Sequence, residues 1–243
     1  MTKTYFITGT DTGVGKTVLS LIMMRYFYRE KKLPFYFKPF QTGCETPLSP
    51  DSDAAFVLRH IPELAEKRGL SDIASSIGIR LREPKAPYFA AKNDKMAVKT
   101  DVIREKLAIC SKGHDVIVLE GAGGLFVPVT RKKTIIDVMA EWGVIPVIAA
   151  RAGLGTINHS VLTINALKKR GLEPCGIVFL KGPGDETDST ALEENMEGVE
   201  MLTGFRPAGV IPAITDFRDI PETCFGVMEN LFAMQSQDGD GGK

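Results

Sequence analysis

Residues 7–17 read Ile7-Thr8-Gly9-Thr10-Asp11-Thr12-Gly13-Val14-Gly15-Lys16-Thr17. An apolar strand is expected over residues 4–8, and a helix with apolar residues at helical spacing is expected over residues 17–32. This order aims backbone N–H groups and the positive end of the helix dipole at one point. We therefore predict a phosphate cradle, in which Lys16 neutralises β- and γ-phosphate charge and the Thr17 hydroxyl holds Mg²⁺.

The cradle departs from the strict phosphate-loop pattern at one position. That pattern places a glycine six residues before the lysine, whereas this chain has Thr10 there and Gly9 one place earlier. The strand, turn and helix that the pattern requires as its context are all expected here. A turn rich in glycine and threonine but without a ligand is the alternative, and the context favours the cradle.

Charge and cysteine content exclude several classes of protein. Thirty basic residues balance thirty acidic ones, so no net field draws the chain to nucleic acid or to a membrane surface. The four cysteines lie far apart without a CxxC pair, which argues against a zinc site and against a disulfide framework. The chain shows neither a basic leader with an apolar core nor a run of 18 apolar residues. We expect a cytoplasmic protein with reduced thiols and with neither a nucleic-acid nor a membrane partner.

Strands and helices are expected to alternate along the chain. After the first pair, the patterns predict strands over residues 34–40, 115–119, 145–150, 174–180 and 208–211, and helices over residues 100–111, 134–142, 153–169, 189–203 and 221–234. The alternation predicts one α/β domain over residues 1–235, with a mostly parallel central sheet flanked by helices on both faces. Residues 236–243 are expected to form a flexible polar tail.

Two segments have weaker patterns. The pattern over residues 50–68 predicts two short helices, which Pro62 separates. Residues 71–94 are expected to form a helix followed by an extended surface segment, because Pro84 and Pro87 interrupt any regular period there.

Charged side chains occur where two expected strands end. Lys38 lies near the end of the second strand, Glu120 directly follows the third, and Asp53 opens a short helix. Because ligands of parallel sheets bind beyond the carboxyl ends of the strands, we expect these residues and the cradle to converge on one triphosphate. Thr17, Asp53 and Glu120 offer the hard oxygen ligands that Mg²⁺ prefers, and Lys16 and Lys38 can stabilise a transferring phosphoryl group. Solvated surface charges and a helix cap are the alternatives for these residues.

Four motifs together resemble the dethiobiotin synthetases, the ATP-dependent ligases that close the ureido ring in biotin synthesis. The resemblance covers nearly the whole chain up to about residue 230, at similar spacing. It rests on the cradle with its threonine at position 10, on Lys38-Pro39 with Thr42-Gly43, on Glu120-Gly121-Ala122-Gly123-Gly124, and on Gly155-Thr156-Ile157-Asn158-His159. It implies a single-domain P-loop fold and a homodimer.

The resemblance also implies a reaction. Diaminopelargonate (7,8-diaminononanoate) and CO₂ form a carbamate, which ATP phosphorylates to a carbamic-phosphoric anhydride. The second amine then displaces phosphate, so that the products are dethiobiotin, ADP and phosphate. By this resemblance Lys16 and Lys38 are catalytic, and Lys38 is the residue usually named as active.

The remaining roles are likewise implied by the resemblance. Mg²⁺ is held by Thr17, Asp53 and Glu120. The nucleotide contacts these and the following residues: Thr12, Gly13, Val14, Gly15, Lys16, Val18, Gly121, Ala122, Gly123, Leu180, Lys181 and Pro212. Thr42 touches the reacting amine or carbamate. The distant carboxylate of the substrate lies on Gly155, Thr156 and Asn158, often from the partner subunit, and a helix start that follows glycines is a suitable anion site.

Two other classes of P-loop protein are alternatives to the dethiobiotin synthetases. A partitioning-type ATPase switch usually carries a signature lysine where this chain has Asp11, and no basic patch for DNA is evident. Another P-loop ligase or a small-molecule kinase is the third possibility. The reaction product distinguishes a kinase from a ring-closing ligase, because a kinase leaves a stable phosphate ester whereas the ligase fixes CO₂ and releases phosphate.

One departure from the family pattern concerns the nucleotide base. Where the family commonly has an asparagine that reads adenine, this chain has Leu180-Lys181, and neither side chain presents the paired donor and acceptor of an amide. We therefore predict weak discrimination between nucleoside triphosphates, with comparable kcat/KM for ATP, GTP and CTP in a coupled phosphate-release assay. A strong preference for ATP would contradict this prediction.

Overall fold

The computed structural model of the chain describes residues 2–64 and 71–237. Within these residues seven strands form one sheet in the order β3-β2-β4-β1-β5-β6-β7, and every pairing is parallel. The strands are β1 (Lys3–Gly9), β2 (Pro34–Gln41), β3 (Ile77–Arg80), β4 (Val116–Gly124), β5 (Ile145–Arg151), β6 (Gly176–Leu180) and β7 (Val210–Ile211). The single α/β domain with a parallel sheet is thus confirmed.

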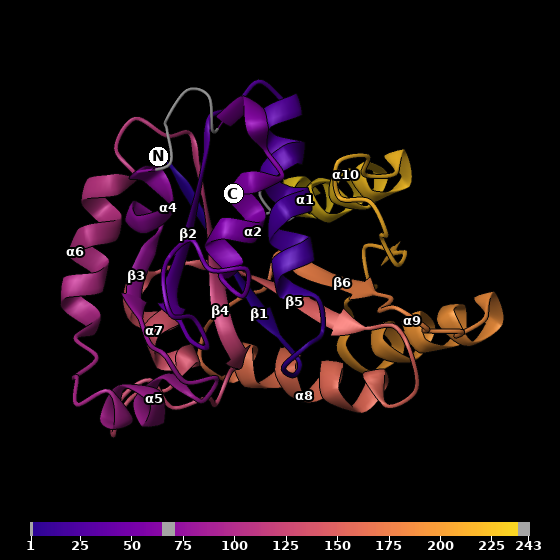
Figure 1. The fold of residues 1–243 in the computed structure, drawn as a ribbon. Helices are drawn as coiled ribbons and strands as arrows, with labels where there is room; N and C mark the ends of the chain where they lie inside the picture. Colours follow the sequence, from indigo (N-terminus) through magenta and orange to yellow (C-terminus); the bar gives the residue numbers. More distant parts are fainter. Residues whose placement is uncertain (1, 65–70, 238–243) are drawn as a thin grey trace, which may run out of the picture.

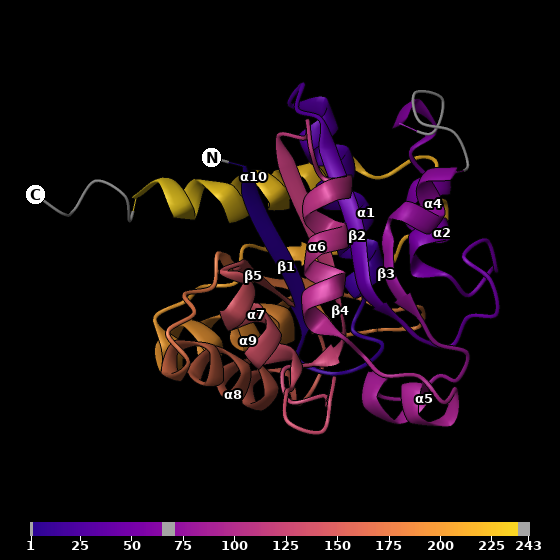
Figure 2. The same cartoon turned by 90° about the vertical axis from the view of Figure 1, so that its left-hand side faces the viewer.

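Helices cover both faces of the sheet (Figure 1, Figure 2). Side chains of one hydrophobic cluster come from α1 (Lys16–Arg29), α2 (Asp53–Arg59) and α10 (Glu222–Gln237). Those of the other come from α6 (Thr100–Cys110), α7 (Ile135–Trp142), α8 (Thr156–Lys169) and α9 (Ser189–Thr203). Tyr5 and Ile7 of β1 belong to the first cluster and Phe6 to the second, because successive strand residues point to opposite faces.

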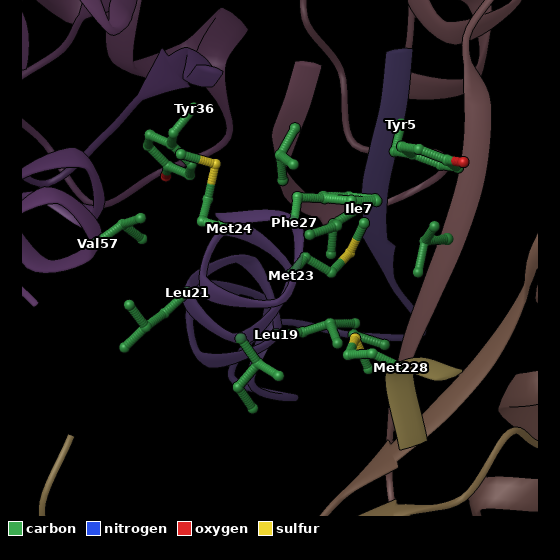
Figure 3. Packing of buried hydrophobic residues seen from close by; sticks show 14 of the residues in the cluster. Tyr5, Ile7, Leu19, Leu21, Met23, Met24, Phe27, Tyr36, Val57 and Met228 are labelled. Carbon is green, nitrogen blue, oxygen red and sulfur yellow. The ribbon is translucent and has the colours of Figure 1, made fainter. Parts of the chain in front are cut away.

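Helix α1 is the most deeply buried helix of the first cluster. Its side chains fill the space between the sheet, α2 and α10, with Leu19, Leu21, Met23 and Met24 almost completely buried (Figure 3). A helix that is apolar on most of its surface requires partners on several sides. Since α1 begins at the cradle, this packing fixes the position of the phosphate-binding turn relative to the sheet.

The structure differs from the expectation for residues 71–94. The helical part is the short α4 (Ser71–Ser75), and the edge strand β3 and the helix α5 (Pro87–Asn93) occupy much of the expected extended segment. The strand has only four residues and contains Gly78, at which a Cβ would lie 2.5 Å from the Pro39 carbonyl oxygen. So short a strand with an internal glycine shows little alternation of apolar and polar residues, which is why the sequence pattern did not predict it.

Two helix ends also differ from the expected positions. Helix α1 stops at Arg29 rather than at residue 32, since Lys31 adopts a left-handed backbone conformation with φ of 58°. Helix α10 continues to Gln237, so the first residues of the expected tail are helical. The rest of that tail, residues 238–243, and the end of the second helix expected over residues 50–68 lie outside the described residues. Within the described part of the chain, no helix combines the length and apolarity needed to cross a bilayer.

Candidate functional site

The strand order brings three polar strand ends together. Strand β4 pairs with β1 on one side and with β2 on the other, so the cradle after β1 lies near Lys38 of β2 and Glu120 of β4. The Lys38 Nζ atom lies 2.7 Å from Glu120 Oε1 and 2.7 Å from Asp53 Oδ2. It also donates to the Gly121 carbonyl oxygen at 3.1 Å. The expected convergence of these charged residues is therefore observed.

Glu120 is a buried carboxylate with four donors. Its side chain is 1% exposed, and it lies within β4, which continues to Gly124, rather than after the strand as expected. Thr17 Oγ1 lies 2.8 Å from Oε1, the atom that Lys38 contacts. Oε2 accepts hydrogen bonds from Ser20 Oγ at 3.0 Å and from the Tyr36 hydroxyl at 2.8 Å. Each oxygen thus has two polar partners, which compensates for the loss of water.

Asp53 reaches the same point from the start of α2. Ser52 caps this helix by accepting from Ala55 N at 3.2 Å, and the Asp53 N–H donates to Gln41 Oε1 at 3.1 Å. Asp53 Oδ1 lies 2.9 Å from Thr17 Oγ1, so the single hydroxyl proton of Thr17 is shared between two carboxylates. The capping role belongs to Ser52, which leaves the Asp53 carboxylate to face the site.

The cradle curls around the first turn of α1. Gly13 and Gly15 have φ values of 72° and 92°, which only glycine adopts without strain. Gly15 precedes the first helical residue, and a Cβ there would lie 2.8 Å from Leu180 Cδ2. Lys16 folds back over the turn, and its Nζ donates to the Asp11 carbonyl oxygen at 3.0 Å.

The two lysines have opposite pKa shifts. Burial and the nearby positive charge of Lys38 lower the pKa of Lys16 to about 8, although Glu120, Asp53 and Asp11 partly oppose this. Burial also disfavours the charged form of Lys38, but its contacts with Glu120 and Asp53 outweigh burial and raise its pKa.

The pKa values of the neighbouring acids follow from the same contacts. Burial raises the pKa of Asp53, yet the charge of Lys38 and the hydrogen bonds of Lys38, Thr17 and Gln41 outweigh it and leave the pKa lowered. Burial and the nearby carboxylates Glu120 and Asp53 raise the pKa of Tyr36 well above its usual value. Tyr36 is therefore a stable hydrogen-bond donor.

Two of the cavities that border the cradle lie against Gly13 and Gly15. The first, of about 620 Å³, is lined by nearly all the residues expected around the phosphates and the metal: Thr12, Gly13, Gly15, Lys16, Thr17, Val18, Lys38, Asp53, Glu120, Gly121, Ala122 and Gly123. Thr42, which was expected at the substrate, lines the same cavity. The second, of about 670 Å³, is lined by Leu180, Lys181 and Pro212, which were expected near the nucleoside, and by Val14, which was expected near the phosphates. Both cavities share Gly13, Gly15 and Val18, so they adjoin each other at the cradle.

Three residues expected to bind the substrate carboxylate lie elsewhere. Gly155 precedes α8 with φ of 89°, Thr156 is 1% exposed with Oγ1 3.4 Å from Ser160 Oγ, and Asn158 is exposed. None of the three lines either of these two cavities. Their assignment to the substrate stays a prediction that involves a second subunit.

Several residues of the site were not expected from the sequence. Residues 84–87 border the phosphate cavity, although they belong to the segment with the weakest pattern. Arg151, Asp185 and Phe217 line the nucleoside cavity. Tyr36 was also missed. It lies two residues before Lys38 on the same strand, and this spacing puts the two side chains on one face of the sheet.

The donor set fits a magnesium ion. Thr17, Asp53 and Glu120 contribute a hydroxyl and two carboxylates, with the hydroxyl within 3 Å of both carboxylates. Across residues 2–64 and 71–237 no group of three or more His, Cys, Asp or Glu side chains forms a metal site. Mg²⁺ commonly takes only one or two protein carboxylates and completes its octahedron with water and phosphate oxygens. These residues therefore suit a metal that arrives with a nucleotide.

A glycine turn between β1 and α1, with a lysine, a threonine and acidic residues at neighbouring strand ends, defines a P-loop nucleotide-binding protein. A family model described as an AAA domain matches residues 3–220. A plasmid partition protein of Borrelia burgdorferi is structurally similar, with TM-score 0.59, 14% identity and coverage of 98% of this chain and 100% of that chain. Cobyrinic acid a,c-diamide synthase of Mycobacterium smegmatis has TM-score 0.55, 14% identity and coverage of 100% and 98%. At these identities the likeness concerns the fold alone.

Sequence comparison is more specific. The ATP-dependent dethiobiotin synthetase of Bradyrhizobium diazoefficiens is 38% identical over 193 residues, which cover 79% of this chain and 82% of that protein. The enzyme of the same name from Brucella anthropi is 36% identical over 214 residues, which cover 88% of each chain. The chain belongs to the dethiobiotin synthetase family.

The lowered pKa of Lys16 predicts a proton exchange on nucleotide binding. At pH 8.5 most Lys16 side chains are neutral in the free protein, since their pKa is about 8, and a bound phosphate raises that pKa. Binding of ADP in EDTA should therefore take up most of one proton at pH 8.5, where the phosphates of ADP are fully ionised, as measured by calorimetry in buffers of different ionisation enthalpy. Lys16→Arg, which stays protonated, should abolish the uptake at pH 8.5. Equal uptake by both proteins would exclude Lys16 as its source.

Proposed function

We propose that this chain catalyses the ATP-dependent closure of the ureido ring, in which diaminopelargonate and CO₂ give dethiobiotin, ADP and phosphate. The observation that carries the proposal is the meeting of Lys38, Glu120 and Asp53 beside the cradle, in a member of the dethiobiotin synthetase family. This arrangement suits phosphoryl transfer, in which positioning and charge stabilisation do most of the catalysis.

The cradle binds the nucleotide. Backbone N–H groups of residues 13–18 surround the phosphates at the positive end of α1, and Lys16 neutralises the transferring charge. Thr17, Asp53 and Glu120 would hold Mg²⁺, which would offset the negative charge of the phosphates. The remaining steps depend on side chains of the protein itself.

Lys38 stabilises the reacting groups. A carbamate oxygen attacks the γ-phosphorus and ADP leaves, and Lys38 balances the negative charge that moves between them. The second amine then attacks the carbonyl carbon of the anhydride, loses a proton and expels phosphate. Thr42 lines the same cavity as Lys38 and contacts the amine or the carbamate.

A homodimer completes the substrate site. Gly155, Thr156 and Asn158 of the partner subunit bind the distant carboxylate at the N-terminal end of α8. The exposed apolar side chains Leu154 and Phe126, which are 100% and 70% exposed, support an interface on this side of the molecule. The enzyme acts in the cytoplasm on small molecules, without a nucleic-acid or membrane partner.

The nucleoside cavity accepts bases other than adenine. Lys181 Nζ donates to the Thr187 carbonyl oxygen at 2.5 Å, so its ammonium group is already engaged. Leu180, Ile214 and Phe217 line the cavity with apolar groups, and such contacts do not distinguish one base from another. These contacts support the use of other nucleoside triphosphates beside ATP.

The partition ATPases that share the fold suggest a second candidate function, a nucleotide-dependent switch. Asp11 occupies the position of their signature lysine, and its carboxylate lies 3.7 Å from Arg151 Nη2. An acidic residue cannot supply the positive charge that such a lysine donates across a dimer. The ligase is therefore the better supported function.

The test is transfer of labelled bicarbonate into product in the presence of diaminopelargonate, ATP and Mg²⁺. The wild-type protein should form labelled dethiobiotin and release one phosphate for each ring closed. Lys38→Ala should lower kcat by roughly 10²-fold or more, as expected for a charge-stabilising group in a preorganised site, while the circular dichroism spectrum stays unchanged. Absence of labelled product from the wild-type protein would reject the proposed reaction.

The contacts of Lys38 predict a competition with the metal. Because its ammonium group holds both carboxylates, a divalent cation must compete with it for the same oxygens. Lys38→Met should therefore bind Mn²⁺ in the absence of nucleotide at least about tenfold more tightly than the wild type, as followed by electron paramagnetic resonance. Lys85→Met is the matched control, since Lys85 borders the same cavity but pairs with Glu83. Equal affinities in wild type and Lys38→Met would refute the competition.

A further inference from the structure

The two oxygens of Glu120 have different surroundings. Oε1 faces the site, where Thr17 Oγ1 lies at 2.8 Å and Lys38 Nζ at 2.7 Å. Oε2 faces the protein interior, where the Tyr36 hydroxyl donates at 2.8 Å and Ser20 Oγ at 3.0 Å. Nothing in the reaction itself requires Tyr36 or Ser20, because neither side chain lines the phosphate cavity.

The positions of these two donors follow from the fold. Tyr36 lies on β2, one pleat before Lys38, and is 1% exposed. Its ring packs in the first hydrophobic cluster with Met24 and Val57 (Figure 3). Ser20 lies one turn after Lys16 on α1, and its hydroxyl is also 2.9 Å from the Lys16 carbonyl oxygen. Hydrogen bonds to Oε2 therefore join α1 and β2 to β4 behind the metal ligands.

Such donors restrict the rotation of a carboxylate. Without a partner on Oε2, the head group of Glu120 can turn about its last bond, and Oε2 becomes a buried acceptor with too few donors. Groups behind a metal ligand orient it, and their removal typically weakens metal affinity or activity by about 10- to 100-fold. The hydroxyl of Tyr36 is the larger contributor here because Ser20 also contacts the Lys16 carbonyl oxygen.

We propose that Tyr36, supported by Ser20, is a positioning residue that holds Glu120 with Oε1 toward Thr17 and so prepares the metal site. The inference rests on the proposed role of Glu120 as a magnesium ligand. It assigns a function to the phenol hydroxyl of Tyr36 that is separate from the packing of its ring.

The test compares Tyr36→Phe with wild type, because this change removes the hydroxyl and keeps the ring. Mn²⁺ binding in the presence of saturating ADP should weaken by about 10-fold or more, as followed by electron paramagnetic resonance. ADP affinity in EDTA should stay within about twofold, since Tyr36 does not line the nucleotide cavities. Ser20→Ala should weaken Mn²⁺ binding in the same direction.

Tyr5→Phe is the matched control. Tyr5 is 3% exposed and belongs to the same hydrophobic cluster, but it lies on β1 apart from Tyr36 (Figure 3). It should leave Mn²⁺ affinity unchanged, and an equal loss in Tyr5→Phe and Tyr36→Phe would reject positioning in favour of general destabilisation. Unchanged Mn²⁺ affinity in Tyr36→Phe would overturn the inference alone. If Glu120→Gln and wild type bind Mn²⁺ equally, the proposed metal site itself fails.

Discussion

The site depends on one buried ion pair, that of Lys38 with Glu120. Their side chains are 5% and 1% exposed, and burying two charges is favourable only when the remaining hydrogen-bonding capacity is also satisfied. Glu120 meets this condition through donors from α1 and β2, and Lys38 through Asp53 and the Gly121 carbonyl oxygen. Loss of one partner would leave an uncompensated buried charge, at a cost of about 3–5 kcal/mol. The same contacts therefore support the native fold and shape the chemistry.

The parallel sheet explains why such a pair is possible. All strands point the same way, so β1, β2 and β4 deliver their carboxyl ends to one edge. Phe35 and Phe37 pack on one face of β2, while Tyr36 and Lys38 point to the other. Tyr36 is in the apolar cluster and Lys38 lies beyond it, where the cluster gives way to the cradle. A single strand thus carries both core side chains and a charged side chain of the candidate site.

The sequence predicted the parts of this arrangement that are local. The cradle, Lys38 and Glu120 each follow from a short motif at a strand end, and the rule for parallel sheets predicts that they lie together. The role of Tyr36 could not be found in this way, because it depends on β4 being the neighbour of β2, and strand order is not written in local periodicity. Strand β3 and residues 84–87 were missed because prolines and a glycine conceal their pattern. Gly155, Thr156 and Asn158 could not be placed at a substrate, because none of them lines either cavity of the site.

The opposite pKa shifts of the two lysines suggest how ligand binding is coupled. Lys38 has two carboxylates as partners, so its charge is already balanced. The Lys16 ammonium instead donates to a backbone carbonyl and contacts no carboxylate of residues 2–64 or 71–237. A phosphate therefore gains most by pairing with Lys16. For Lys38 to act on the reacting groups as proposed, another cation must take its place at Glu120 and Asp53. The charges of the two lysines and the two carboxylates sum to zero. A metal and a nucleotide that bind here would therefore form ion pairs with charges that are already paired with one another. In the proposed reaction, this exchange would link the arrival of the metal with the release of Lys38.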